Sequence, residues 1–491
     1  MTKIRWICAL VAVAGVMAGC EKPSPVPEEY RDLDEETRAQ RKYVNLFAWN
    51  AMNTYYLWRD EVSAALEKWG DWDEPIQKVA DVRYKDAQGH DIDRWTMLTD
   101  DFSSFSGGVS GHTRTNGMDF ALYYADQAKT RICAVVTYTY AGSPAEMAGL
   151  KRGDVILTLD GQEMTPDNYQ ELVRDRLLGG GTVKAGLRGG GTVTLTAVDM
   201  YEDPVQTACV LENALGRKVG YLHYTSFTLD SCDDLVEAFR GFTQAGIDDL
   251  VLDLRYNGGG YIITEEVLAS LVAPVREVEA KSILSREIYN ATLTKEIGAD
   301  TTFFRTNFSF RDGGETHVVS TQGANPDLPR LYVLATGSSA SASESLVCCL
   351  KPYMDVILLG NRTSGKYCAG VMLEASSWYA GVKDKLEEGE YEKAKPYVDN
   401  WGLYVMYARY ADRDGVTLSM PDGIAPDHEV NDNPLDGYPL GDPRETMLAA
   451  ALEWMEGGTR ATQGENGPIP CLEPIPGDAH PRGSNLFIRL L

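Results

Sequence analysis

The feature that most constrains the fold of this chain is a run of short apolar strands that alternate with helices from about residue 205 to 456. The expected strands are 219–223, 250–254, 331–335 and 356–359, and the expected helices are 233–242, 264–272 and 343–350. Alternation of this kind is typical of an α/β core. The second strand runs into a glycine-rich turn and the third into a serine-rich one.

Length and charge limit the possible classes of function. At roughly 100–200 residues per domain, 491 residues correspond to about three domains. The formal net charge of −26 repels phosphate backbones, so we expect no nucleic-acid partner. The six histidines are scattered and form no H-E-x-x-H pattern, which disfavours a zinc hydrolase. We therefore expect neither a metal nor a cofactor.

The N-terminus has the pattern of an export signal. Lys3 and Arg5 precede an apolar stretch too short to span a bilayer, and small residues precede Cys20. This pattern resembles a bacterial lipoprotein signal, which implies removal of residues 1–19 and lipid on Cys20. The alternative is an ordinary secretory signal in which Cys20 is incidental. Under the first interpretation, we expect a lipid-anchored protein of the bacterial cell envelope, facing the periplasm or the exterior.

Changes in amino-acid composition mark three further segments outside the core. Residues 20–35 are rich in proline and acidic residues and predict a flexible tether. Residues 36–105 show apolar positions at helical spacing and predict a helical region. Residues 457–491 are rich in glycine, proline and polar residues and predict a loosely ordered extension. The fold class is thus a multidomain α/β protein, with a mixed α/β core at 205–456.

Residues 106–200 are expected to form a small β-rich domain. Ser143-Pro144 marks a helix start and Gly153-Asp154 a tight turn before a strand at 155–159. The segment resembles a PDZ domain of the bacterial protease type. The resemblance places Gly117, Met118, Asp119 and Phe120 at the carboxylate-binding loop, where exposed amides could hold the end of a peptide. The alternative is a turn that merely closes the domain, and the charge of Asp119 opposes an incoming carboxylate.

The serine-rich turn is a candidate for nucleophilic chemistry. A strand runs through Gly337 into small residues and then into a helix, whose N-terminus offers a partial positive charge and free amides. Four serines compete for the role: Ser338, Ser339, Ser341 and Ser343. An ordinary serine-rich helix cap is the alternative.

Two further segments could complete such a site. Lys366 follows a glycine-bearing turn, and a buried lysine with a depressed pKa can act as a general base in a Ser–Lys dyad. The alternative is a solvated lysine. The glycines at 258–260 could supply oxyanion amides or could simply form a turn between a strand and a helix. His428 beside Asp427 could pair with a serine, although a surface position fits it better.

Together these segments resemble the C-terminal processing (tail-specific) serine peptidases. The resemblance covers about residues 106–456 and depends on the PDZ segment, GYLHYTSF from Gly220, DLRYNGGG at 253–260, GSSASASE at 337–344, TSGK at 363–366 and GIAPD at 423–427. It implies a core of the ClpP/crotonase-like type. It further implies Ser341 as nucleophile, Lys366 as base, and the amides of Ala342 and of Gly259 or a neighbouring glycine as oxyanion donors. Its substrates would be polypeptides with exposed C-terminal tails.

One position departs from the family pattern. Better-studied members carry a glutamine four residues after the lysine, where this chain has Gly370. Either another group orients Lys366 or the enzyme is slower. A catalytically weak or inactive lipoprotein that binds peptides through its PDZ domain is therefore the alternative function.

Overall fold

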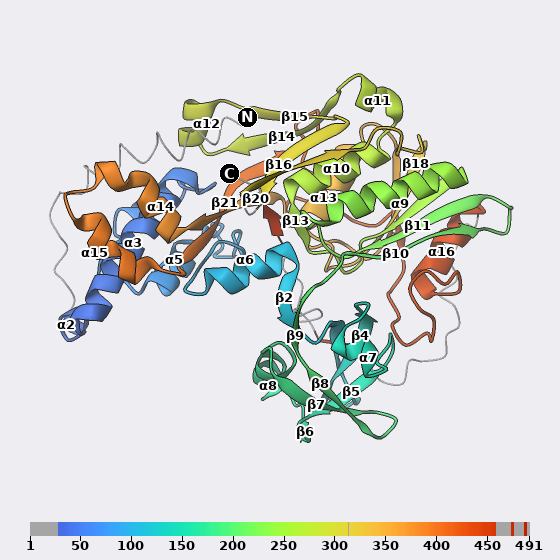
Figure 1. Ribbon diagram of the computed structural model, residues 1–491, viewed down its shortest axis with the longest axis horizontal. Helices are drawn as coiled ribbons and strands as arrows, with labels where there is room; N and C mark the ends of the chain where they lie inside the picture. Colours follow the sequence, from blue (N-terminus) through green and yellow to red (C-terminus); the bar gives the residue numbers. More distant parts are fainter. Residues whose placement is uncertain (1–27, 313, 458–472, 476–485, 489–491) are drawn as a thin grey trace.

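The computed structural model describes residues 28–312, 314–457, 473–475 and 486–488. The predicted signal peptide, Cys20 and most of the predicted tether lie outside these residues. In Figure 1 the α/β core fills the upper part of the molecule, helices from the N-terminal region cover one end, and a small β-rich lobe extends below. Within the described residues, no helix is both long enough and apolar enough to cross a membrane.

The core is built on a six-stranded sheet. Its strand order is β10 (Val205–Glu212), β11 (Lys218–Tyr224), β12 (Asp249–Asp253), β18 (Arg330–Ala335), β19 (Asp355–Gly360) and β22 (His428–Glu429). The last five strands are parallel, and β10 pairs antiparallel with β11. Every residue of β12 is buried, as expected of a parallel strand covered on both faces.

Helices cover both faces of this sheet. On one face lie α9 (Ser231–Ala245), α10 (Ile262–Val272) and α13 (Ala342–Leu350), whose apolar side chains share a core with Leu252 and Val333 (Figure 1). On the other face α16 (Thr446–Met455) packs against Val251 and Tyr332. Alternate residues of one strand thus contribute to two separate cores.

A second, seven-stranded sheet lies beside the first. Its order is β13 (Gly259–Tyr261), β24 (Leu486–Ile488), β20 (Cys368–Glu374), β21 (Gly402–Ala411), β14 (Ile283–Tyr289) and β15 (Asp300–Phe303), with β1 (Met97–Thr99) also paired to β21. The bounds of the remaining core elements are α11 (Val275–Glu279), α12 (Ala291–Ile297), β16 (Asn307–Asp312) and β17 (Glu315–Ser320).

The N-terminal region is helical in part. It contains α2 (Glu28–Arg31), α3 (Glu35–Tyr55), α4 (Ser63–Leu66), α5 (Pro75–Val82) and α6 (Phe102–Ser110), and α3 packs against α14 (Ala375–Val382) and α15 (Glu390–Val398) of the core. The helix α3 begins where the Asp34 side chain accepts a hydrogen bond from the Thr37 amide. Tyr55, Tyr56 and Trp58 are buried in the main hydrophobic core, which fits a packing role.

The lower lobe is a β-sheet domain with its own core. Its sheet order is β23 (Glu473–Pro474), β3 (Met118–Tyr124), β4 (Ile132–Thr139), β5 (Val155–Leu159), β7 (Thr182–Leu187) and β8 (Thr192–Thr196), with β6 (Gln162–Glu163) paired to β5. The short helices are α7 (Pro144–Met147) and α8 (Tyr169–Leu172). The strands β2 (His112–Thr115) and β9 (Val198–Tyr201) pair and connect the lobe to the rest of the chain (Figure 1).

Two parts of the region predicted as a loose extension form strands instead. Glu473–Pro474 pairs with β3 of the lower lobe, and Leu486–Ile488 pairs with both β13 and β20. Composition did not predict these strands because each is only two or three residues long and is stabilised by a partner distant in sequence.

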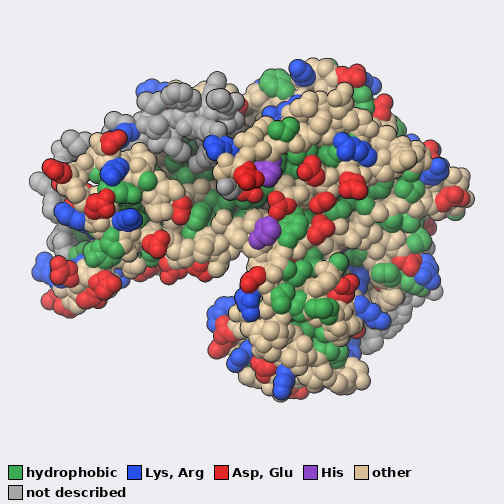
Figure 2. All heavy atoms as spheres, viewed as in Figure 1, with side chains coloured by type: hydrophobic (Ala, Val, Ile, Leu, Met, Phe, Trp, Pro, Cys, Tyr) green, Lys and Arg blue, Asp and Glu red, His purple; other side chains and the backbone are tan. Residues whose placement is uncertain are grey.

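Charges on the molecule are mixed. On the face drawn in Figure 2, Lys and Arg side chains lie among Asp and Glu side chains, and the lower lobe stands off from the N-terminal helices across a hollow. This face carries no large basic patch of the kind that binds a phosphate backbone.

Candidate active site

Ser341 stands at the N-terminus of α13 in a strained conformation. Its φ of 62° lies in the left-handed region, which costs a residue with a side chain of order 1–3 kcal/mol. The residue is fully buried, and its Oγ has no hydrogen-bond partner among the described residues. A strained, buried hydroxyl without a partner is unusual in a folded protein and indicates a functional role.

The neighbouring serines have structural partners. Ser339 donates its hydroxyl to the carbonyl of Leu254 over 2.7 Å and accepts a bond from the Thr336 amide. Ser343 donates to the carbonyl of Asn257 over 3.0 Å. Both hydroxyls hold the serine turn against the glycine-rich turn. Of the three buried serines of this turn, Ser341 is therefore the one whose hydroxyl has no partner among the described residues, while Ser338 is only partly buried.

Lys366 is fully buried in the loop between β19 and β20. Its Nζ lies 2.9 Å from the hydroxyl of Tyr404 and over the ring of Trp95, 5.7 Å from the centroid. Burial lowers the pKa of Lys366 to about 8, against the smaller opposing effects of Cys368 and Asp93. Near neutral pH the neutral, basic form of this amine is therefore accessible.

The carboxylate of Glu344 connects the two segments that carry Ser341 and Lys366. Its Oε2 accepts the amides of Ser341 and Lys366, each over 2.9 Å, and its Oε1 accepts the amide of Gly365 and the hydroxyl of Thr363. The amide nitrogens of Ser341 and Lys366 thus lie within two hydrogen-bond lengths of each other. Burial raises the pKa of Glu344 to about 7, although these bonds favour its ionised form.

Backbone amides near Ser341 offer an oxyanion site. Ala342 is the first residue of α13, where an N–H group has no acceptor within the helix. The Gly259 amide donates to Asn257 Oδ1 over 2.8 Å, so it is already engaged. The amide of Gly258 has no partner among the described residues. Between Gly258 and Gly259, Gly258 is therefore the one whose amide is not already engaged by a described residue.

The four residues predicted for peptide binding start β3 of the lower lobe. Met118, Asp119 and Phe120 are buried, and the Gly117 amide donates to the Thr115 hydroxyl over 2.9 Å. Asp119 accepts a bond from the Thr137 hydroxyl. Because the Gly117 amide is engaged, carboxylate capture by this loop stays a prediction.

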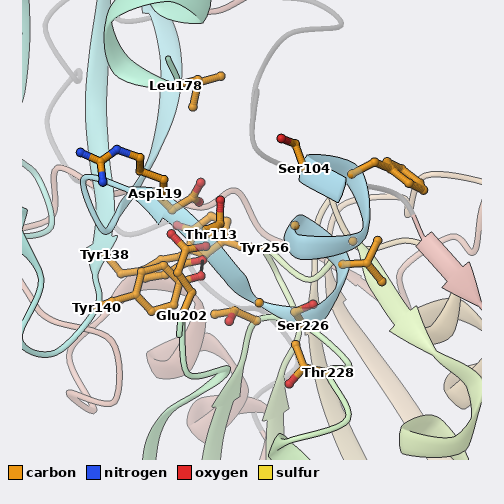
Figure 3. A pocket seen from close by; sticks show the side chains of 17 residues that line it. Ser104, Thr113, Asp119, Tyr138, Tyr140, Leu178, Glu202, Ser226, Thr228 and Tyr256 are labelled. Carbon is orange, nitrogen blue, oxygen red and sulfur yellow. Dashed lines mark hydrogen bonds between the residues drawn. The ribbon is translucent and has the colours of Figure 1, made fainter. Parts of the chain in front are cut away.

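A cavity of about 330 Å³ lies between the lower lobe and the core (Figure 3). Asp119 and Tyr138 line it from the lobe, Ser104 from α6, and Ser226 and Gly258 from the core. The cavity therefore extends from the predicted peptide-binding strand to the glycine turn beside Ser341.

An ionic cluster joins the lower lobe to the same glycine turn. Arg152 of the lobe donates to the Tyr256 hydroxyl and to Asp432 Oδ1, both over 2.7 Å. Arg255 contacts Asp432 at 2.9 Å and Glu445 at 2.7 Å. Although burial opposes ionisation, the two guanidinium groups hold the pKa of Asp432 well below its usual range.

His428 lies away from Ser341. Its ring centroid is 4.9 Å from that of Trp454 of α16, with the two rings tilted by 33°, on the opposite face of the sheet from α13. The described part of the chain holds no group of three His, Cys, Asp or Glu side chains that could bind a metal.

Two residues of the site were missed by the sequence analysis. Glu344 stands three residues after Ser341, in the S-x-x-E pattern of a capping box, so a local signal existed. Tyr404 lies 38 residues beyond Lys366 and reaches it only because β20 and β21 pair. No local pattern could have identified it.

The fold combines a PDZ-like lobe with a mixed α/β core. A model of peptidase family S41 matches residues 218–430, and a PDZ domain model matches residues 135–177. The core is therefore similar to the S41 peptidases over residues 218–430. The predicted fold class, a mixed α/β multidomain protein with a PDZ domain and a peptidase core, is confirmed.

Two curated relatives and one solved structure are similar to this chain. A carboxyl-terminal-processing protease of Synechocystis is 28% identical over 340 residues, covering 68% of this chain and 67% of that protein. The chloroplastic C-terminal processing peptidase of Tetradesmus obliquus is 27% identical, covering 60% of this chain and 57% of that protein. A Bacteroides fragilis chain assigned to the S41 proteases shares the fold, with a TM-score of 0.62, 24% identity, and coverage of 90% of this chain and 100% of that one. The chain thus spans about two thirds or less of the two curated relatives.

Proposed function

We propose that this chain is a serine endopeptidase that cleaves polypeptides near their C-terminal tails. The observation that carries the proposal is the pairing of a strained, unpartnered Ser341 with a buried Lys366 through one carboxylate, that of Glu344. The names of the curated relatives support cleavage near C-terminal tails.

In the proposed reaction, neutral Lys366 takes the proton of Ser341 Oγ as the oxygen attacks the scissile carbonyl. The amides of Ala342 and Gly258 stabilise the negative charge of the tetrahedral intermediate. Lys366 then gives the proton to the leaving amine, which leaves an acyl-enzyme on Ser341. Water hydrolyses this ester, with Lys366 again accepting a proton.

A PDZ domain beside the core supports delivery of the substrate's tail. The cavity of Figure 3 connects Asp119 of the PDZ domain with Gly258 of the glycine turn. A polypeptide engaged at the PDZ domain could thus extend through this cavity toward the glycine turn.

The test is turnover of an unfolded protein by the wild type and by Ser341→Ala. We expect Ser341→Ala to lose activity by at least about a thousandfold while remaining folded, since only one unpartnered hydroxyl is removed. Ser343→Ala is the control and should keep measurable activity. Equal turnover by wild type and Ser341→Ala would reject the proposal, and no turnover by either would favour the peptide-binding alternative.

Tail dependence is tested separately. Two unfolded substrates that differ only in an apolar or an acidic C-terminal tail should differ in KM, with the apolar tail preferred. Identical KM values would mean that the enzyme does not select substrates by their tails.

We also propose that the mature protein is anchored to a membrane of the bacterial envelope by lipid on Cys20. The support is the sequence pattern around Cys20. Cys20→Ala should move the protein to the soluble envelope fraction. A variant that stays with the membranes after a high-salt wash would contradict the anchor.

A further inference from the structure

Gly370 stands four residues after Lys366 in a position that admits no side chain. A Cβ built there would lie 2.3 Å from Cε2 and Cζ of the Tyr404 ring and 2.6 Å from Cε of Met406. Real Cβ atoms do not approach other atoms so closely. The space that a side chain at position 370 would occupy is therefore filled by Tyr404.

Tyr404 is held rigidly in that space. It lies on β21 opposite Met372 of β20 and Met97 of β1, so strands flank it on both sides. The centroid of the Phe105 ring lies 5.7 Å from the centroid of the Tyr404 ring, and Tyr404 is buried. With two flanking strands and a packed ring, the hydroxyl has little freedom to move.

The hydroxyl of Tyr404 points at the proposed base. The Tyr404 oxygen accepts a hydrogen bond from Lys366 Nζ over 2.9 Å, and Nζ lies 5.0 Å from the ring centroid. A hydrogen bond to one N–H of an amine fixes the rotation of the amine group and thus the direction of its lone pair. A correctly directed lone pair is what a general base requires.

We propose that Tyr404 is the positioning residue that orients Lys366 toward Ser341, and that the glycine at position 370 exists to make room for it. This inference rests on the proposed function, in which Lys366 is the base. In this role Tyr404 acts through Lys366 and not on the substrate. It replaces, from a neighbouring strand, the side chain that position 370 lacks.

The main test is Tyr404→Phe, which removes the hydroxyl and keeps the ring. We expect kcat to fall about 10- to 100-fold with KM nearly unchanged. The hydroxyl oxygen also stabilises the ammonium form, so its loss should move the acidic limb of the kcat/KM profile to lower pH. A purely structural role would lower the rate without moving the limb.

Tyr407→Phe is the matched control. Tyr407 lies on the same strand, is also buried and donates its hydroxyl to Glu287 rather than to the lysine. Its variant should keep the wild-type pH profile. If the acidic limb of the kcat/KM profile moves by the same amount in Tyr404→Phe and in Tyr407→Phe, the inference is overturned.

A second pair of variants tests directly whether the Tyr404 ring takes the place of a side chain at position 370. Gly370→Gln alone should lose activity because the new side chain meets the Tyr404 ring. Tyr404→Ala with Gly370→Gln should recover at least tenfold over Tyr404→Ala, because the amide oxygen can then accept the bond from Lys366. If the double variant recovers no activity, a side chain at position 370 cannot take over the role proposed for Tyr404.

The outcomes separate this inference from the proposed function. If the wild type shows no Ser341-dependent turnover, the proposed function fails and the inference fails with it. If the wild type cleaves but Tyr404→Phe keeps its rate and pH profile, the inference alone is wrong.

Discussion

At the scale of single residues, the site depends on what burial does to two ionisable groups. Lys366 is an ammonium ion in water, but its fully buried position lowers its pKa to about 8. Glu344 is a carboxylate in water, and burial raises its pKa to about 7. The environment thus moves both groups toward neutral pH, which is common where acid–base chemistry occurs.

The first prediction concerns pH. If the neutral form of Lys366 is the base, as proposed, kcat/KM should rise about tenfold per pH unit below pH 8 and level off above it. Activity should be lost as the pH falls, since protonation removes the lone pair. The measurement is kcat/KM for an unfolded substrate between pH 5 and 10, with excess chelator throughout.

Lys366→Arg serves as the control for this profile. Arginine keeps the positive charge but stays protonated, because its pKa exceeds about 12. The variant should be as inactive as Lys366→Ala at every pH. Retained turnover in the arginine variant, or a flat wild-type profile, would remove Lys366 from the mechanism.

At the scale of elements, Glu344 matters because it connects the start of α13 to the loop before β20. Four donors from these two segments converge on its two oxygens. In addition to packing, this one side chain thus helps to fix the relative position of the proposed nucleophile and the proposed base.

The second prediction is that Glu344→Gln separates the nucleophile from the base. An amide offers one acceptor oxygen, and its NH₂ group would face backbone N–H groups, so at least two of the four bonds are lost. We expect kcat to fall about 10- to 1,000-fold and the protein to lose about 1–3 kcal/mol of stability. Activity and thermal unfolding are measured together. A fully active Glu344→Gln variant would show that the two segments hold their places without this carboxylate.

The elements of the core could be predicted because their signals are local. The strand expected at 250–254 is β12 (Asp249–Asp253), and the helix expected at 343–350 is α13 (Ala342–Leu350). The serine turn and Lys366 drew attention because each follows a recognisable glycine-bearing segment, whereas the choice of Ser341 among four serines came from the family resemblance; the roles of both residues stay predictions. Three features could not be predicted, since each depends on which segments meet in three dimensions. They are the engaged amide of Gly259, the contact of Tyr404 with Lys366 and the pairing of β24.

At the scale of the whole molecule, the PDZ domain is connected to the catalytic region by the buried cluster around Arg152. Arg152 contacts Tyr256, two residues before Gly258, and shares Asp432 with Arg255. The position of the PDZ domain is therefore coupled to the backbone segment that supplies the proposed oxyanion amide.

The third prediction is that Arg152→Ala destabilises the protein and raises KM. Removing one member of a buried ionic cluster lowers the free energy of unfolding by about 3–5 kcal/mol. The loss should be smaller here, because Asp432 still pairs with Arg255. The thermal unfolding midpoint should fall, and limited proteolysis should release the PDZ domain sooner. Arg174→Ala is the control, because Arg174 is exposed and its one ion pair among the described residues is with its exposed neighbour Asp175. Equal behaviour of the two variants would contradict the coupling.

The last prediction concerns β24, the strand at Leu486–Ile488. It pairs in parallel with β13, directly after Gly258, and reaches Gly370 of β20. On its other side β13 meets Phe227, so both edges of β13 are paired. A substrate that adds to β13 as a strand must therefore displace β24, and the segment competes with substrate for the same backbone groups.

Deleting residues 486–488 should remove this competition. Because the substrate would no longer have to break two or three backbone hydrogen bonds, KM should fall roughly 3- to 30-fold. The value of kcat should stay the same, because Ser341 and Lys366 are unchanged. A synthetic peptide spanning residues 484–490, added to the deletion variant, should raise KM again. Unchanged KM after the deletion would mean that substrate enters by another edge, and a lower kcat would mean that β24 supports the site instead of competing for it.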